Sequence, residues 1–486
     1  MAGQTTVVVI SALILLGSGL FSWWKTSTID FLFLLDTCLS SLPASDIKSN
    51  LLASIKDFTM AVSSAGQLFG SIATVILVHI QLALAQNVST GFSLGARALA
   101  PLDPPVKTAD PLGTYGVGVR RETYDFEDRQ LNVSWWYPAN TASGCKIYLE
   151  SGGIYGTACS EAPLDTSGGP YPLILFSPGL AAHDDTYFFY CQNLASYGYI
   201  VVSINHLDAT KAAVAANPIA YISAIVQALL NNSSWTVWLI YSNWFRSTHF
   251  ALTYRPQEQQ FILDQAIAAA SNSSSFFNGM IDTNNIGMSG HSLGGFYTLI
   301  KGGGLAIYCD KPLSASESNT QNILVTEISI CAWPEAKNLT SPQALHDPRI
   351  KAIISLAPPL FFQSEDEISR AAAAIKTPMM IITGNDPKLE STLAPQEQVY
   401  DSATTPKYIV EIDNTDHLLV SEAYQFNKGP GSLISAEDKA NFTEKATVYE
   451  VYSSAFFDVY LKNMTERKGV MHSKSSEFVA KLEYND

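Results

Sequence analysis

The sequence predicts an α/β protein in which a mostly parallel central sheet is flanked by helices. The stretch Leu173–Phe176 is a continuous apolar run, which is typical of a strand buried on both faces. A helix-like stretch from Asp184 to about Tyr197 and a second apolar strand, Tyr199–Ile204, follow it. A strand, a helix and a further strand in this order imply that the two strands are parallel.

Two strands are expected before this unit, at Gly113–Val119 and Leu131–Pro138, joined by a polar turn at Asp125–Gln130. An amphipathic helix is expected over Gln257–Ala270, and a closing helix within Ala436–Arg467. Later apolar runs predict four more strands, of which the fourth would be the last: Ile286–Met288, Ile350–Leu356, Pro378–Thr383 and Tyr408–Ile412.

The 486 residues suit one large domain over residues 113–480, preceded by an N-terminal leader and linker over residues 1–112. The leader holds two apolar runs, Thr6–Trp24 and Leu68–Ala85. Each has about the 20 residues that a membrane-spanning helix needs. The predicted fold therefore carries an apolar N-terminal membrane or signal region.

Three interpretations of the leader stay open. Both runs span the membrane, or the second is a cleavable signal and Met60 is the true start, or both are buried globular helices. Lysines lie between the two runs, and positive residues favour the cytosolic side. With either membrane interpretation, the part after Ala85 lies outside the cytosol, so we expect a secreted or membrane-anchored protein.

Composition narrows the classes of partner. The net charge of −15 argues against a nucleic-acid partner, because phosphate binding needs a basic surface. Absence of a C-x-x-C pair gives no support to a zinc site, and no cofactor is expected. Eight Asn-x-Ser/Thr sites suggest a glycosylated surface: Asn87, Asn132, Asn231, Asn232, Asn272, Asn338, Asn441 and Asn463.

The cysteines predict two local disulfides in an oxidising compartment. Cys145 with Cys159, and Cys309 with Cys331, each flank a polar segment. Cys191 lies in an apolar helix-like run and is expected to be a buried free thiol.

Residues 209–255 form a long, aromatic insertion that includes Trp238 and Trp244. It is either an extra helical layer packed on the core or a lid that meets lipid, since Trp and Tyr suit the membrane boundary. We place both tryptophans in the substrate pocket on the lid interpretation.

The segment Gly290-His291-Ser292-Leu293-Gly294 matches the G-x-S-x-G pattern that holds a nucleophilic serine on a sharp strand-to-helix turn. Glycines two residues before and after Ser292 leave room where a Cβ would collide with the neighbouring backbone. An apolar strand precedes the pattern and a helix-like run follows it, which is the context that this motif requires.

A serine nucleophile needs a base, usually a histidine held by a carboxylate. Asp386 follows one later strand and His417 follows the next, so both fall on the sheet edge that carries Ser292. The order serine, acid, histidine is the one found with this motif. Three other carboxylates, all close to His417 in sequence, stay as alternatives for the acid: Glu411, Asp413 and Asp416.

The loop after Phe176 is the natural source of a second oxyanion donor. We expect the backbone N–H groups of Leu180 and Leu293 to form the oxyanion hole. His183 and His206 lie on loops at the same edge and are interpreted as pocket lining.

Six segments together resemble the platelet-activating-factor acetylhydrolase and dienelactone-hydrolase-like branch of the α/β-hydrolases. The resemblance covers roughly residues 113–467 and is carried by these segments: Trp136-Tyr137-Pro138-Ala139, Phe176-Ser177-Pro178-Gly179-Leu180, Ser196-Tyr197-Gly198-Tyr199-Ile200-Val201-Val202, Asn205-His206-Leu207-Asp208, Tyr254-Arg255-Pro256 and Gly290-His291-Ser292-Leu293-Gly294-Gly295.

This resemblance implies an α/β-hydrolase fold and a metal-free serine esterase with Ser292, Asp386 and His417 as its triad. Vertebrate plasma members carry their acid just after the strand that follows the elbow helix. That place reads Ser355-Leu356-Ala357-Pro358 here and has no carboxylate, so the acid moves to Asp386, as in bacterial relatives.

Three functions stay open. The first is an esterase, acting at a membrane or lipid surface, that removes the short sn-2 acyl group of a platelet-activating-factor-like phospholipid. The second is a general carboxylesterase or polyester hydrolase. The third, from another class, is a catalytically silent hydrolase fold used for adhesion.

Overall fold

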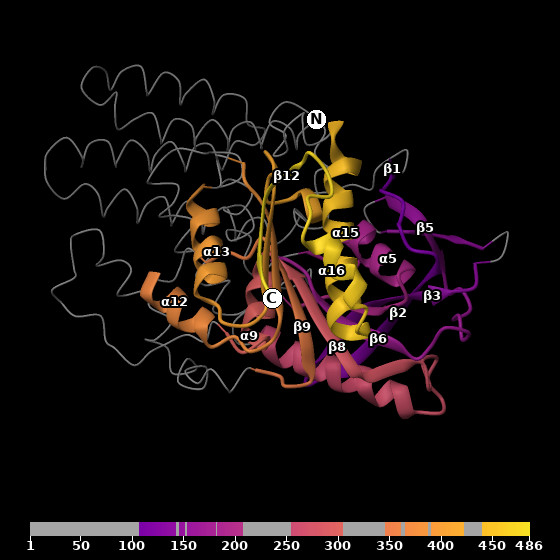
Figure 1. Ribbon diagram of the computed structural model, residues 1–486. Helices are drawn as coiled ribbons and strands as arrows, with labels where there is room; N and C mark the ends of the chain where they lie inside the picture. The colour runs from indigo at the N-terminus through magenta and orange to yellow at the C-terminus, as the bar shows by residue number, and fades with distance from the viewer. Residues whose placement is uncertain are drawn as a thin grey trace, which may run out of the picture. The chain divides into compact units, whose positions relative to one another are not determined.

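The computed structural model describes residues 106–141, 145–150, 153–180, 182–207, 254–304, 346–360, 365–386, 390–421 and 440–486. All of them belong to one compact unit, Leu94–Asp486. Their strands form a single twelve-stranded sheet in the order β1-β5-β2-β3-β7-β6-β8-β9-β10-β11-β12, with β4 paired to β5 (Figure 1).

The strands have the following bounds: β1 Val106–Lys107, β2 Gly116–Phe126, β3 Arg129–Ala139, β4 Ile147–Leu149, β5 Ile154–Ser160, β6 Tyr171–Ser177, β7 Ile200–Ile204, β8 Ile281–His291, β9 Ile350–Leu356, β10 Met379–Gly384, β11 Lys407–Ile412 and β12 Val479–Asn485. Residues 254–271 are helical. The labelled helices are α5 Phe188–Ser196, α9 Leu293–Lys301, α12 Glu365–Ala373, α13 Glu390–Ser402, η5 Leu419–Ser421, α15 Phe442–Lys462, η7 Thr465–Arg467 and α16 Lys468–Met471.

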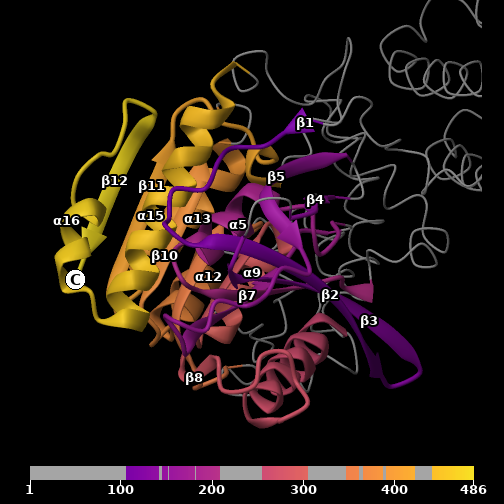
Figure 2. The same ribbon diagram turned by 90° about the vertical axis from the view of Figure 1, so that its right-hand side faces the viewer.

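The centre of the sheet is parallel from β7 through β6, β8, β9 and β10 to β11. Antiparallel strands lie outside it, with β3 against β7 and β12 against β11. Figure 2 shows β12 at one edge and the β2–β3 hairpin towards the other. Because parallel strands present their carboxyl ends at one edge, the loops after β6, β8, β10 and β11 meet there.

Two apolar cores cover the two faces of the sheet. One packs α5 and α15 against the strands through side chains such as Phe188 and Phe456. The other packs α9, α12, α13 and the 254–271 helix through side chains such as Phe296 and Ile262. Helices therefore flank the sheet on both sides, as the sequence predicts, and the strands between them are buried on both faces.

The predicted strands are confirmed, with three corrections. The hairpin turn is tighter than expected, because β2 ends at Phe126 and β3 begins at Arg129. The strand β11 is not the last one, since β12 follows it as an antiparallel edge strand. Only its first residue, Val479, is buried, so β12 lacks the apolar run that reveals the central strands. The short β1 lies in the stretch interpreted as a linker and pairs with β5.

The disulfide between Cys145 and Cys159 is confirmed, and Cys191 is a buried free thiol. Several predictions lie outside the described residues: the two apolar runs at 6–24 and 68–85, most of the 209–255 insertion, and the Cys309–Cys331 pair. Within the described ranges, no helix combines the length and apolar character needed to cross a bilayer.

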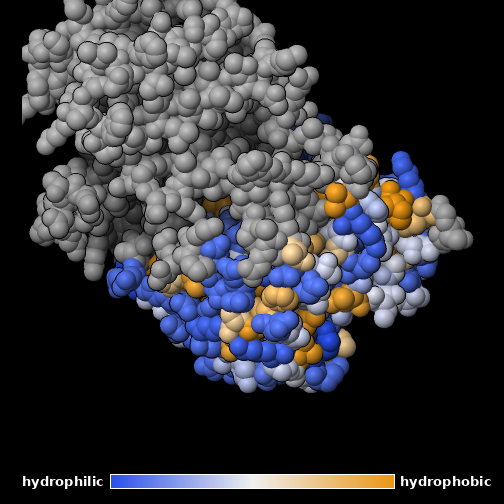
Figure 3. All heavy atoms as spheres, turned by 90° about the horizontal axis from the view of Figure 1, so that it is seen from above, coloured by the Kyte–Doolittle hydropathy of each residue, from blue (hydrophilic) through white to orange (hydrophobic). Residues whose placement is uncertain are grey.

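The described surface seen from above mixes hydrophilic and hydrophobic residues, with hydrophilic ones prominent (Figure 3). Large apolar side chains that are exposed include Leu112, Ile147, Leu149 and Tyr484. Ile147 and Leu149 lie on β4 and Tyr484 lies on β12, at opposite ends of the sheet, so these side chains do not form one patch.

Candidate active site

Ser292 occupies the sharp turn between β8, which ends at His291, and α9, which begins at Leu293. Its backbone angles are φ 52° and ψ −123°, a combination that costs a non-glycine residue roughly 1–3 kcal/mol. Backbone bonds hold the turn in place, since the Ser292 N–H donates to the Leu356 carbonyl at 2.8 Å. The predicted nucleophile elbow is therefore present in the fold.

The motif glycines are required by close backbone contacts. A Cβ on Gly294 would overlap the carbonyl oxygen of Ser177, at the end of β6. A Cβ on Gly290 would crowd the Gly294 and Ser177 carbonyls in the same way. The elbow thus brings Ser292 close to the loop that follows β6, where an oxyanion donor is expected.

His417 comes from the loop after β11, and its Nε2 lies 2.8 Å from the Ser292 Oγ. Burial lowers the pKa of His417 to about 4, so the imidazole is neutral near pH 7 and can accept a proton. The structure brings these two predicted residues into direct contact, at the distance that general-base catalysis needs.

Asp386 follows β10, and its loop is bonded to the segment that carries His417. The Asp386 N–H donates to the Thr415 carbonyl at 3.3 Å. The Asn385 side chain accepts the Asn414 N–H at 2.7 Å. Asp386 is partly buried, and its backbone is tied to the segment that carries His417, so its role as the orienting acid stays a prediction.

The alternative carboxylates have local contacts of their own. The Asp416 Oδ1 accepts the Leu418 N–H at 2.6 Å, which caps the turn after His417. Glu411 lies on β11, and its Oε1 is 3.5 Å from the Lys481 Nζ on β12. Asp413 is exposed, and its backbone N–H bonds to Phe478. Glu411 and Asp416 are thus held by local contacts and Asp413 faces solvent, so we keep Asp386 as the proposed acid.

The loop of Pro178, Gly179 and Leu180 lies beside the nucleophile. A Cβ on Gly179 would come 3.4 Å from the Ser292 Cβ. Leu293 is the first residue of α9, so its backbone N–H belongs to the helix N-terminus next to Ser292. Gly179 therefore lies beside Ser292 and Leu293 follows it directly, while the oxyanion-hole role of Leu180 and Leu293 stays a prediction.

A buried network that the sequence did not reveal holds this loop. The Arg255 guanidinium is fully buried and donates to the carbonyls of Pro178 at 2.6 Å and Gly179 at 2.9 Å. The Ser177 hydroxyl bonds to the Nε2 of His206 at 2.9 Å, and the Gln259 amide donates to it at 3.0 Å. Arg255 thus fixes the carbonyls of Pro178 and Gly179 in the loop that precedes Leu180.

His206 belongs to this network and not to the pocket lining that we expected. Its Nδ1 lies 2.7 Å from the Glu258 carboxylate, which is also buried. His183, the other histidine of that prediction, has an exposed side chain. Trp238 and Trp244 lie outside the described residues. Ser177, His206 and Arg255 of this network stand in three of the segments that carry the resemblance, but nothing in the sequence indicated that they bond to one another.

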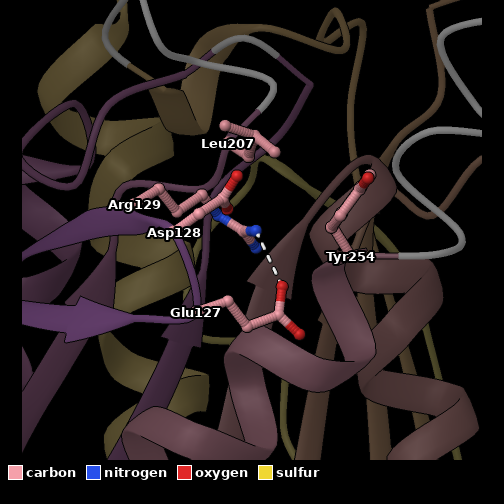
Figure 4. Close-up of a pocket in the computed structure, with 5 residues that line it drawn as sticks. All are labelled: Glu127, Asp128, Arg129, Leu207 and Tyr254. Carbon is pink, nitrogen blue, oxygen red and sulfur yellow. Dashed lines mark hydrogen bonds and ion pairs between the residues drawn. The ribbon is translucent and has the colours of Figure 1, made fainter.

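A separate cavity of about 510 Å³ lies at the β2–β3 hairpin. Figure 4 shows its lining residues Glu127, Asp128, Arg129, Leu207 and Tyr254, with Arg129 bonded to Glu127 at 3.3 Å. Neither Ser292 nor His417 lines it. Its link to the site is indirect, through the Arg129 guanidinium, which also donates to Glu258 at 2.9 Å.

Residues 142–243 match the family model described as platelet-activating factor acetylhydrolase, isoform II. That confirms the resemblance to this branch of the α/β-hydrolases. The matched residues of this chain include the Ser177–Leu180 loop but end before Ser292, Asp386 and His417. The match supports a carboxylic ester hydrolase.

Among solved structures, the chain is similar to a ferulic acid esterase from Streptomyces cinnamoneus, with 15% identity and a TM-score of 0.47. That similarity covers 78% of this chain and 99% of the other. No curated protein matches the chain.

Proposed function

We propose that the protein is a serine esterase that cleaves a carboxylic ester through an acyl-enzyme on Ser292. The observation that carries the proposal is the 2.8 Å contact between the Ser292 Oγ and the Nε2 of His417. A strained elbow residue and a buried imidazole in hydrogen-bond contact form the arrangement that activates a serine hydroxyl.

In the first half of the reaction, the Ser292 Oγ attacks the ester carbonyl carbon while His417 Nε2 takes the hydroxyl proton. The N–H groups of Leu180 and Leu293 would stabilise the negative oxygen that forms. When this intermediate collapses, the bond to the alcohol oxygen breaks. The alcohol leaves with the proton from His417, and the acyl group stays on Ser292.

In the second half, water attacks the acyl carbon while His417 takes a proton from it. Collapse of the new intermediate returns that proton to Ser292 and releases the carboxylic acid. Asp386 orients His417 and stabilises its charged form in both halves. None of these steps needs a metal or a cofactor.

The substrate that we propose is the short sn-2 acyl ester of a platelet-activating-factor-like phospholipid. The family match supports it, because residues 142–243 span the oxyanion loop and much of the aromatic insertion. On this proposal, His183, Trp238 and Trp244 line the pocket, and the enzyme works at a lipid surface outside the cytosol. The Cys145–Cys159 disulfide supports an oxidising compartment.

Labelling with a fluorophosphonate probe tests the proposal. We expect the wild-type protein to be labelled and Ser292→Ala to lose labelling completely. Ser289→Ala is the matched control, since Ser289 lies on β8 three residues before Ser292, but its hydroxyl bonds to Tyr190 in the interior. Folded wild-type protein that is not labelled would contradict the proposal and favour the adhesion function.

Turnover of two esters then tests the substrate class. We expect a short-chain sn-2 acetyl phospholipid to be hydrolysed with a higher kcat/KM than a soluble aryl acetate. Preference for the aryl ester, or for polyester film, would leave the serine mechanism intact and assign the protein to the general carboxylesterases.

A further inference from the structure

We propose that His291 and Tyr187 position the oxyanion loop and the His417 loop relative to one another, as a hydrogen-bonded relay across the site. His291 is the variable residue of the G-x-S-x-G motif, and Tyr187 directly precedes α5. The proposal rests on the esterase function above and adds two positioning residues to it.

The relay consists of three hydrogen bonds. The Gly179 N–H donates to the Tyr187 hydroxyl oxygen at 2.8 Å. That oxygen lies 2.9 Å from the Nδ1 of His291. The Nε2 of His291 lies 2.8 Å from the carbonyl oxygen of His417. Gly179 adjoins Leu180, so the relay begins beside a proposed oxyanion donor and ends on the proposed base.

With a neutral His291, the two ends of the relay fix the direction of every bond. The Gly179 amide can only donate, and the His417 carbonyl can only accept. Nε2 of the neutral ring therefore carries the hydrogen, and its bare Nδ1 accepts from the Tyr187 hydroxyl, whose oxygen accepts from Gly179. A single neutral tautomer of His291 satisfies all three bonds.

The surroundings of His291 agree with this neutral form. The side chain is buried, and burial lowers the pKa of His291 well below its usual value. Its ring centroid lies 4.6 Å from that of His417. A positive charge on His291 would repel the imidazolium that His417 forms during the reaction, whereas a neutral His291 ring does not.

The geometry gives the relay a role beyond filling space. An apolar side chain of similar size could pack between α5 and β8, but it could not bond to both loops. The two loops come from different strands, β6 and β11, and each supplies a group that must lie within about 0.5 Å of its working position. His291 and Tyr187 join them through bonds of fixed length and direction.

The chain offers a matched control for Tyr187. Tyr190 lies three residues further along the chain, within α5, is equally buried, and also packs on Phe176. Its hydroxyl bonds to the Ser289 Oγ at 2.9 Å, outside the relay. Replacing either tyrosine by phenylalanine removes one buried hydroxyl that bonds to β8, but only Tyr187→Phe breaks the relay.

The experiment measures kcat and KM on a soluble aryl ester, together with Tm, for single and double variants. We expect Tyr187→Phe to lower kcat about 10- to 100-fold with KM within about twofold, because misplacement of reacting groups acts on the chemical step. Tyr190→Phe should shift Tm by a similar amount and leave kcat within about twofold of wild type.

His291→Leu should lower kcat as Tyr187→Phe does, and the double variant should lose little more than either single variant, since both break one relay. His291→Gln can still donate to the His417 carbonyl and should recover part of kcat. If His291→Leu does not fold, the Tyr187→Phe and Tyr190→Phe pair decides alone.

Equal kcat values for the two tyrosine variants would overturn the proposal and leave His291 and Tyr187 with a purely structural role. Additive losses in the double variant would overturn it as well. Ser292→Ala, measured in parallel, separates the two proposals. An active Ser292→Ala protein refutes the esterase mechanism, whereas an inactive one with a normal Tyr187→Phe refutes only the relay.

Discussion

The Nε2 of His417 lies 2.8 Å from the Oγ of Ser292, although 125 residues separate them in the chain. Their strands, β11 and β8, are not neighbours either, since β9 and β10 lie between them in the sheet. The contact is made by the loops beyond the strand ends, where parallel strands bring distant segments to one edge.

The first prediction concerns pH. Because burial lowers the pKa of His417 to about 4, the free base persists well below the ordinary histidine value of about 6.5. Protonation removes the base, so kcat/KM should stay level down to about pH 5 and fall as the pH drops through about 4. A profile of kcat/KM on a soluble ester, with folding checked by circular dichroism, measures this. A fall in kcat/KM centred near pH 6.5 or above would show that a neighbouring carboxylate raises the pKa of His417 more than burial lowers it.

The second prediction assigns the acid. Asp386→Asn should lower kcat at pH 7 on the order of 10³- to 10⁴-fold, since an amide cannot support the imidazolium. Asp416→Asn should retain kcat within about threefold, because an asparagine oxygen can still accept the Leu418 N–H. Steady-state kinetics on both variants decide the matter. The opposite ranking would assign the role to Asp416.

The third prediction concerns the elbow. Gly294→Ala should prevent folding or abolish probe labelling, because the new Cβ would overlap the Ser177 carbonyl. Gly469→Ala on α16 is the control, since a Cβ there meets nothing within 4 Å. It should leave labelling intact and raise the free energy of unfolding by roughly 0.5–1 kcal/mol. Soluble yield, Tm and labelling report the outcome. A labelled, stable Gly294→Ala protein would contradict the close approach of β6 to the elbow.

The fourth prediction concerns stability. Glu450 on α15 is 1% exposed, and among the described residues neither carboxyl oxygen has a hydrogen-bond partner. Burial, helped by the charge of Asp110, raises the pKa of Glu450 to about 9, against 4.5 for an ordinary glutamate. Between these values the folded state binds more protons than the unfolded state, so stability falls as pH rises.

Glu450→Gln removes the titrating carboxyl group and with it this loss of stability at high pH. The Tm gain of this variant over wild type should therefore be larger at pH 8 than at pH 5. Glu477→Gln, which makes the same change at an exposed side chain, is the control. Thermal melts at both pH values test this. Parallel Tm curves for wild type and Glu450→Gln would show that Glu450 does not titrate in this range.

Much of the fold could be read from local patterns. Continuous apolar runs such as Ile350–Leu356 mark strands buried on both faces, and their alternation with helices implies parallel pairing. The sequence did not predict the strand β12, because an edge strand is half exposed and needs no continuous apolar run. The Cys145–Cys159 disulfide was predicted because its partners lie close in sequence.

The sequence by itself determined the position of the proposed nucleophile and of its proposed base. The elbow at Ser292 needs glycines at fixed spacing, and His417 follows a strand at the edge where Ser292 must lie. These are constraints on neighbouring residues and on strand order, which a linear sequence displays.

Only the tertiary structure decided which buried polar groups bond to one another. Arg255, Tyr187 and His291 have no recognisable pattern for their partners, because each bond joins segments from different strands or helices. A hydrogen bond depends on distances of a few tenths of an ångström and on direction, and those are set by how the helices pack on the sheet.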